Sequence, residues 1–186
     1  MALIVGLGNT RPEYEGTRHN IGIEIARAVA THLSAEWEEG NGPFLFARAR
    51  HKGQNVMLMI PTTLMNRSGQ AVLRASRLYD VLPSEILVCT DDVSLDTGII
   101  RMRAKGGDGG HNGLADIIEK LETNKFPRLR FGVGSDYPKG KQAEYVLSTF
   151  NSDENATVEE SVKRASDACL CFVREGIHQA MNRYNG

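Results

Sequence analysis

The stretch that most constrains this chain is a short apolar run followed by a polar loop and the start of a helix. Met1–Leu7 is typical of a buried strand, and apolar residues at four-residue spacing predict a helix over Asn20–Leu33, with Asn20 as its cap. Strand carboxyl ends and helix amino ends are where α/β folds gather polar groups, so we expect Asn9 and His19 to lie close together.

Two interpretations of this pair stay open at this point. In the functional one, His19 is a general base and Asn9 binds a carbonyl or hydroxyl group beside it. In the structural one, Asn9 closes a turn and His19 lies in the cap region of the helix.

Later parts of the chain repeat the pattern of strand, polar cluster and helix. Asn66 follows a strand that ends at Pro61, and it is predicted either to cap the next helix or to reach into a cleft. Asp91 follows the apolar run 85–89 and is a candidate to accept a proton from the imidazole of His19.

The turn at 52–54 predicts a hairpin. A short helix is expected within 143–150 and a long amphipathic one over 153–175.

Length and composition indicate a single domain over residues 1–186, with a core large enough to need no disulfide bonds or structural metal sites. The three cysteines show neither a disulfide pattern nor metal-ligand spacing, which favours a reducing compartment. No apolar run approaches the ~20 residues of a membrane helix, and no signal peptide is visible, so we expect a cytoplasmic protein. The net charge of −1 means that any nucleic-acid surface must be a local basic patch.

A glycine-rich loop over 106–113 separates two predicted elements and carries His111 and Asn112 to the entry of a helix. Loops of this kind let backbone N–H groups approach a phosphate or a sugar. The earlier Gly6-x-Gly8 is not a dinucleotide fingerprint, because Arg11 occupies the place of its third glycine.

Basic residues cluster in the second half of the chain and are accompanied by side-chain amides. Such a strip suggests a polyanionic ligand with a neutral reacting end, because amides suit carbonyls and basic side chains suit phosphates. The strip comprises Arg101, Arg103, Lys105, Arg128, Arg130, Lys139 and Lys141.

With these motifs in order, the sequence resembles the bacterial-type peptidyl-tRNA hydrolases from Ile4 to about Asn182. The resemblance is strongest in Val5–Asn9, Tyr14–Gly22, Pro61–Gly69, Gly109–Leu114 and Arg128–Gly134. It implies a single α/β globule in which helices flank both faces of a twisted mixed β-sheet. The implied reaction is hydrolysis of the ester that joins a peptide to the 3′ ribose of tRNA, which recycles stalled peptidyl-tRNA.

The resemblance also implies roles for individual residues. His19 is the base that takes a proton from water, Asp91 orients it, and Asn9 helps to discriminate blocked from free aminoacyl ends. The residues that line the site for the peptide and the 3′ CCA end are Tyr14, Leu64, Asn66 and Asn112. Those at the positions of contacts with phosphates of the acceptor stem are Arg103, Lys105 and Arg130. A monomer is implied, with no metal or cofactor.

Four positions depart from the family's usual pattern. The family usually has His at the position of Thr90, an aromatic residue at Leu64, Lys at Arg103 and Gly at Lys105. These changes bear on affinity for tRNA more than on the chemistry.

Two other functions are weighed against this one. A non-catalytic RNA-binding protein on the same fold would keep the basic strip but would not need Asn9, His19 and Asp91 together. A metal-dependent hydrolase would use His19, Asp91 and His111, but the chain lacks a His-x-x-x-His or Cys-x-x-Cys pair of ligands.

Overall fold

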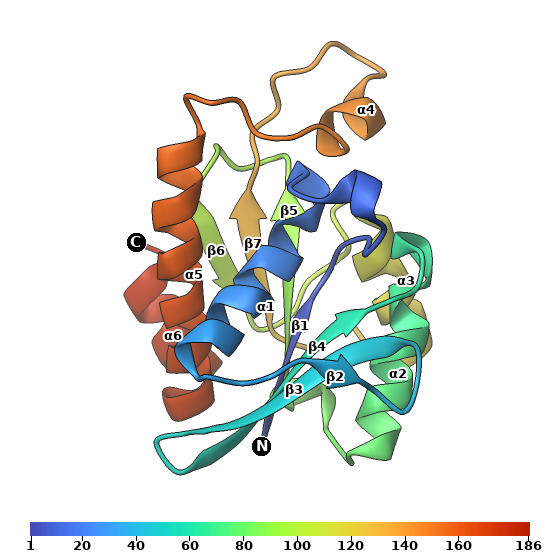
Figure 1. The fold of residues 1–186 in the computed structure, drawn as a ribbon, viewed down its shortest axis with the longest axis vertical. Coiled ribbons are helices and arrows are strands. Elements are labelled where there is room, and N and C mark those ends of the chain that lie inside the picture. Colours follow the sequence, from blue (N-terminus) through green and yellow to red (C-terminus); the bar gives the residue numbers. More distant parts are fainter.

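A computed structural model describes all 186 residues, which form one seven-stranded sheet with helices on both faces (Figure 1). The order of strands in the sheet is β2-β3-β4-β1-β5-β7-β6. The strands are β1 (Ala2–Gly6), β2 (Glu38–Glu39), β3 (Phe44–His51), β4 (Gln54–Pro61), β5 (Ile86–Asp92), β6 (Ile100–Arg103) and β7 (Arg128–Gly132). The four central strands, β4, β1, β5 and β7, are parallel, and the outer pairs are antiparallel. The mixed sheet expected from the family resemblance is therefore confirmed.

The helices follow the sequence pattern closely. They are α1 (Ile21–His32), α2 (Ser68–Leu78), α3 (Asn112–Leu121), α4 (Gln142–Val146), α5 (Asn155–Glu175) and α6 (Ile177–Tyr184). Two short 3-10 turns lead directly into helices, namely η2 (Arg18–Asn20) into α1 and η3 (Met65–Arg67) into α2. Two more, η1 (Pro12–Tyr14) and η4 (Pro83–Glu85), precede η2 and β5. The predicted hairpin joins β3 to β4. The helix expected within 143–150 is shorter and begins at Gln142.

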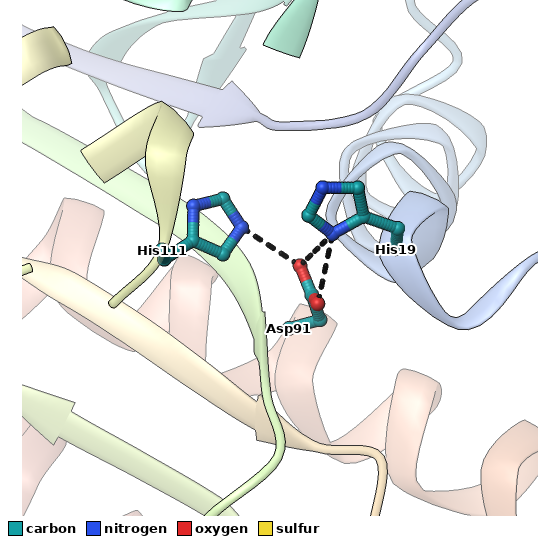
Figure 2. A group of neighbouring side chains, drawn as sticks. All are labelled: His19, Asp91 and His111. Atoms are coloured by element: carbon teal, nitrogen blue, oxygen red, sulfur yellow. Dashed lines mark hydrogen bonds and ion pairs between the residues drawn. The ribbon is translucent and has the colours of Figure 1, made fainter. Parts of the chain in front are cut away.

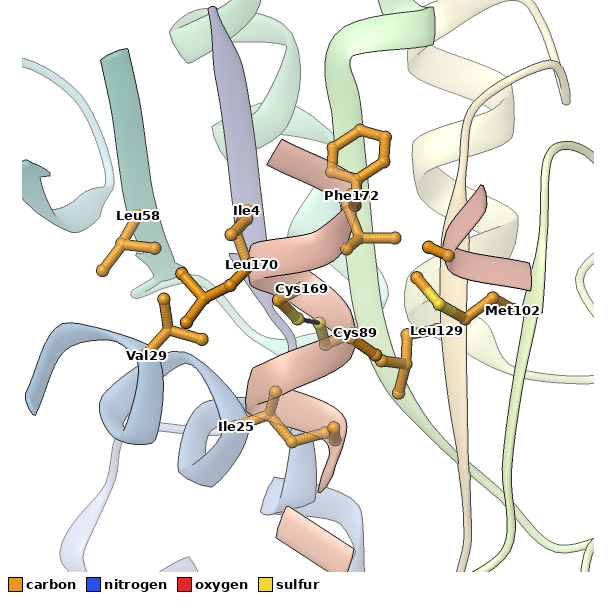
Figure 3. Packing of buried hydrophobic residues seen from close by; sticks show 14 of the residues in the cluster. Ile4, Ile25, Val29, Leu58, Cys89, Met102, Leu129, Cys169, Leu170 and Phe172 are labelled. Atoms are coloured by element: carbon orange, nitrogen blue, oxygen red, sulfur yellow. Dashed lines mark hydrogen bonds between the residues drawn. The ribbon is translucent and has the colours of Figure 1, made fainter. Parts of the chain in front are cut away.

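Alternation along the central strands divides the core into two layers. On β1, Ile4 packs with α1 and α5 on one face, whereas Leu3 and Val5 pack with α2 and α3 on the other. Figure 3 shows the first layer, where Cys89 of β5 meets Cys169 of α5 with 3.7 Å between their sulfur atoms. The hydrogen bond with Cys89, together with burial, raises the pKa of the Cys169 thiol, so Cys169 packs as a neutral side chain.

Two glycines allow α1 to approach the sheet closely. A Cβ atom on Gly22 would collide with the carbonyl oxygen of Cys89, and one on Gly6 would collide with the carbonyl oxygen of Gly22. Only glycine permits this backbone contact. The first turn of α1 therefore lies against β5 two residues before Asp91, and this places η2 and His19 at the carboxyl edge of the sheet.

None of the six helices is long and apolar enough to cross a bilayer.

Candidate active site

His19 of η2 and Asp91 of β5 meet at the carboxyl edge of the sheet. The Nδ1 atom of His19 lies 2.9 Å and 3.0 Å from the two carboxylate oxygens of Asp91. The Asp91 side chain is 4% exposed and the His19 side chain is 18% exposed. A buried carboxylate therefore holds one edge of an imidazole whose other edge is nearer to solvent, and this is the contact that the sequence predicted between the two residues.

A second imidazole reaches the same carboxylate from the opposite side, as Figure 2 shows. The Nε2 atom of His111 lies 2.9 Å from Asp91 Oδ1, and the two histidine rings are 5.0 Å apart between centroids. His111 also caps α3, since its Nδ1 accepts hydrogen bonds from the backbone N–H groups of Gly113 and Leu114. Sequence analysis placed His111 at the helix entry but gave it a role only in the metal alternative.

These contacts fix the tautomers of both rings. The Nδ1 atom of His111 faces two N–H donors and carries no proton, so its Nε2 is protonated and donates to Asp91. An ionised carboxylate only accepts, so Nδ1 of His19 is the protonated nitrogen of that ring. In its neutral form, His19 therefore keeps a free lone pair on Nε2.

The same contacts keep Asp91 ionised. Burial is the largest single influence on its carboxyl group and by itself would raise the pKa. The combined charge interactions and hydrogen bonds of His111 and His19 outweigh burial and hold the pKa of Asp91 well below its ordinary value. A fixed negative charge thus lies beneath His19.

Asn9 is bound to Asn20, the residue that follows His19. The backbone N–H of Asn9 donates to Asn20 Oδ1 at 2.7 Å, and Asn20 Nδ2 donates to the carbonyl oxygen of Asn9 at 2.8 Å. Asn20 occupies the N-cap position of α1 as predicted, but its side chain makes no capping hydrogen bond, because both ends of its amide are used to hold Asn9. The Asn9 side chain closes a turn by accepting from the N–H of Arg11, as the structural interpretation proposed.

A cleft of about 640 Å³ opens beside His19 and Asp91. The glycine-rich loop forms one wall and α4 another. Four of the residues predicted for the site line this cleft, namely His19, Asp91, Asn112 and Arg130. Asn112 is exposed and opens α3 next to His111.

The other predicted site residues lie outside the lining of this cleft. Tyr14 is half-buried in η1, and Leu64 and Asn66 are exposed at η3. Neither role predicted for Asn66 is found, because it does not line the cleft and Arg67 occupies the cap position of α2.

The basic strip divides into exposed and structural members. Arg103 and Lys105 are exposed, while Arg130 is half-buried and pairs with Asp92 at 3.0 Å. Including Arg128 in the strip was wrong, because its side chain is buried and donates to the carbonyl oxygens of Phe126, Gly107 and Asn124. Burial and the charge of Arg130 lower the pKa of Arg128 to about 10. Arg128 therefore anchors the glycine-rich loop instead of facing a ligand.

The metal alternative meets an obstacle in the second imidazole. The donor atoms of His19, Asp91 and His111 lie within 4.8 Å of one another. However, Nε2 of His111 could ligate a cation only as an imidazolate or after breaking the cap, because its Nδ1 already accepts two N–H groups. The donor set therefore suits a hydrogen-bonded relay better than a metal ion.

Fold and site together define the class, an α/β protein with a paired imidazole and carboxylate at the wall of a cleft. Comparisons with known proteins then narrow the class. The family model described as "Peptidyl-tRNA hydrolase" matches residues 3–186. The chain therefore belongs to the peptidyl-tRNA hydrolase family.

Individual relatives are similar to this chain over nearly their full lengths. Peptidyl-tRNA hydrolases from Chlorobaculum parvum and Chlorobium phaeovibrioides are each 44% identical over 186 residues, with 100% of this chain and 98% of each relative covered. The crystal structure of peptidyl-tRNA hydrolase from Acinetobacter baumannii superposes with a TM-score of 0.95 at 35% identity, covering 100% of this chain and 95% of that one.

Proposed function

We propose that this protein hydrolyses the ester between a peptide and the 3′ ribose of tRNA, with His19 as the general base that activates water. Family membership supports the reaction, and the Asp91–His19 contact supports the assignment of the base. Residues 1–186 act as one catalytic domain. The enzyme recycles stalled peptidyl-tRNA for translation as a cytoplasmic monomer, and its three buried free cysteines are consistent with that compartment.

In the proposed reaction, Nε2 of His19 removes a proton from a water molecule, which attacks the ester carbonyl. The charge that develops on the imidazole is balanced by Asp91, which already accepts from Nδ1 at 2.9 Å. The tetrahedral intermediate then collapses, and the His19 imidazolium returns its proton to the 3′ oxygen of the leaving ribose. A base of this kind contributes about 10²–10⁴-fold to the rate.

Side-chain amides are suited to the carbonyl end of the substrate. The oxygen of the Asn9 amide accepts from Arg11, which leaves its NH₂ group free to donate, and the amide of Asn112 faces the cleft. We assign the Asn9 amide to the discrimination of the blocked amino end, and the Asn112 amide to the 3′ end of tRNA and the peptide. Tyr14, Leu64 and Asn66 contact the peptide and the CCA end outside the cleft, near η1 and η3.

The acceptor stem is bound by the exposed basic residues at the other edge of the site. Arg103 and Lys105 contribute free charges, and Arg130 contacts a phosphate by exchanging its partner Asp92 for it. Binding of this kind weakens as the salt concentration rises.

The observation that carries this proposal is the His19 ring held by Asp91 at the wall of a cleft, and a paired assay tests it. Purified protein is expected to release N-acetylated amino acid from acylated tRNA and to leave unblocked aminoacyl-tRNA intact. His19→Ala should lower kcat by about 10²–10⁴-fold while binding of tRNA is unchanged. The matched control is His32→Ala, an exposed histidine at the end of α1. A near-normal rate in His19→Ala would remove the assignment.

A further inference from the structure

The residue before His19 makes an extensive set of contacts to which the proposed reaction gives no role. Arg18 is 3% exposed, and its guanidinium donates to three acceptors that all belong to the segment 145–154. These acceptors are Ser148 Oγ at 2.7 Å, the carbonyl oxygen of Thr149 at 2.5 Å and Glu154 Oε2 at 2.9 Å.

Two aromatic rings of the same segment cover the guanidinium. Its central carbon lies 4.2 Å from the ring centroid of Tyr145 and 5.2 Å from that of Phe150. Tyr145 is held in turn from β7, because its hydroxyl donates to the carbonyl oxygen of Val133 at 2.7 Å. Arg18 therefore clamps the end of α4 to η2, the turn that carries His19.

The opposite side of this clamped segment forms a wall of the cleft. Four residues at α4 line it together with His19, namely Gln142, Ala143, Val146 and Leu147. They provide one amide and three apolar side chains, without any charge. Such a surface suits the peptidyl part of the substrate and offers no positive charge to a phosphate.

We propose that Arg18 is a positioning residue that sets the distance between α4 and His19, and that this wall binds the peptidyl group of the substrate. The inference rests on the proposed function and adds where the acyl group lies and what holds its wall. Arginine suits the task because one planar fork reaches several acceptors and stacks on aromatic faces at once, which an ammonium group does not.

Arg18→Lys tests the proposal, because lysine keeps a charge for Glu154 but loses the fork and the stacking. We expect KM for N-acetyl-aminoacyl-tRNA and for peptidyl-tRNA to rise about tenfold, with kcat changed less than about threefold. The inhibition constant of uncharged tRNA should stay the same, since it lacks the acyl group. Glu154→Gln, a milder change in the same clamp, should raise KM in the same direction, and the double variant should be less than additive.

Arg27→Lys is the matched control, because Arg27 is exposed on α1 and pairs only with Glu15 and Glu24. Circular dichroism at the assay temperature verifies that each variant is folded. The proposal is overturned if KM is unchanged in both clamp variants, if kcat alone falls, or if the inhibition constant of uncharged tRNA rises as much as KM. Failure of the wild-type protein to select blocked substrates would instead count against the proposed function itself.

Discussion

The two ends of the candidate site are built differently. Around Asp91, both carboxylate oxygens accept hydrogen bonds from neighbouring imidazoles, and these contacts fix the tautomer of each ring. The carboxyl group is almost fully buried. At the basic edge, Arg103 and Lys105 lie on the surface without a carboxylate partner. The reacting end is thus preorganised, whereas the edge assigned to tRNA acts through exposed charge, for which position matters less.

This contrast predicts that small changes near Asp91 affect turnover, while changes at the basic edge affect binding and its dependence on salt.

After loss of His19 itself, the largest effect is expected from removing the second imidazole. His111→Asn keeps a residue that caps helices well but does not reach Asp91, so the carboxylate loses one of its two partners. We expect kcat to fall about 10–100-fold, which is the usual effect of losing a hydrogen bond to a charged group. Affinity for tRNA should be unchanged. Single-turnover kinetics together with tRNA binding measure the two quantities. A variant that weakens binding and spares kcat would break the division.

At the basic edge, Arg103→Ala and Lys105→Ala should each weaken tRNA binding a few-fold and reduce the slope of log K against log salt by about one. Their kcat at saturating substrate should match that of the wild type. A titration of affinity against salt concentration for each variant measures the slope. If the slopes stay unchanged, the phosphates are bound on another face of the protein.

The smallest effect concerns stability and pH. Asp91 has a lowered pKa in the folded protein, so its ionised contacts stabilise the fold fully above its unfolded pKa, close to 3.8. That contribution is lost as the pH falls below this value toward the folded pKa. The difference in the free energy of unfolding between wild type and Asp91→Asn should therefore shrink as the pH falls below about 4. Urea denaturation as a function of pH measures it, and a difference that grows in acid would contradict the ionised assignment.

The sequence was sufficient for the parts of the molecule that depend on local pattern. Apolar periodicity located β1 and α1 to within a residue, whereas β5 continues to Asp92, three residues past the predicted end of its apolar run. The strand-to-helix rule brought His19 and Asp91 to the same edge. These features follow from burial and from the geometry of parallel sheets, both of which leave a trace in short windows of sequence.

The rest depends on which of several possible partners a polar side chain takes. Asn20 is of a residue type that often caps helices, yet its side chain binds Asn9. Arg128 is of a residue type that often binds phosphate, yet its side chain anchors a loop. His111 is not a usual capping residue, and its position before Asn112 at the end of a glycine-rich loop was the only signal of its contact with Asp91. Such choices are settled by residues distant in the sequence and cannot be read from a local pattern.

The central claim is that Asp91 holds the Nδ1–H edge of His19 and leaves Nε2 free to act as the base. Long-range ¹H–¹⁵N correlation spectra of the wild-type protein, recorded at alkaline pH, show which ring nitrogen of each histidine carries the proton. The account predicts His19 protonated on Nδ1 and His111 protonated on Nε2. A spectrum with His19 protonated on Nε2 and bare on Nδ1 would contradict it.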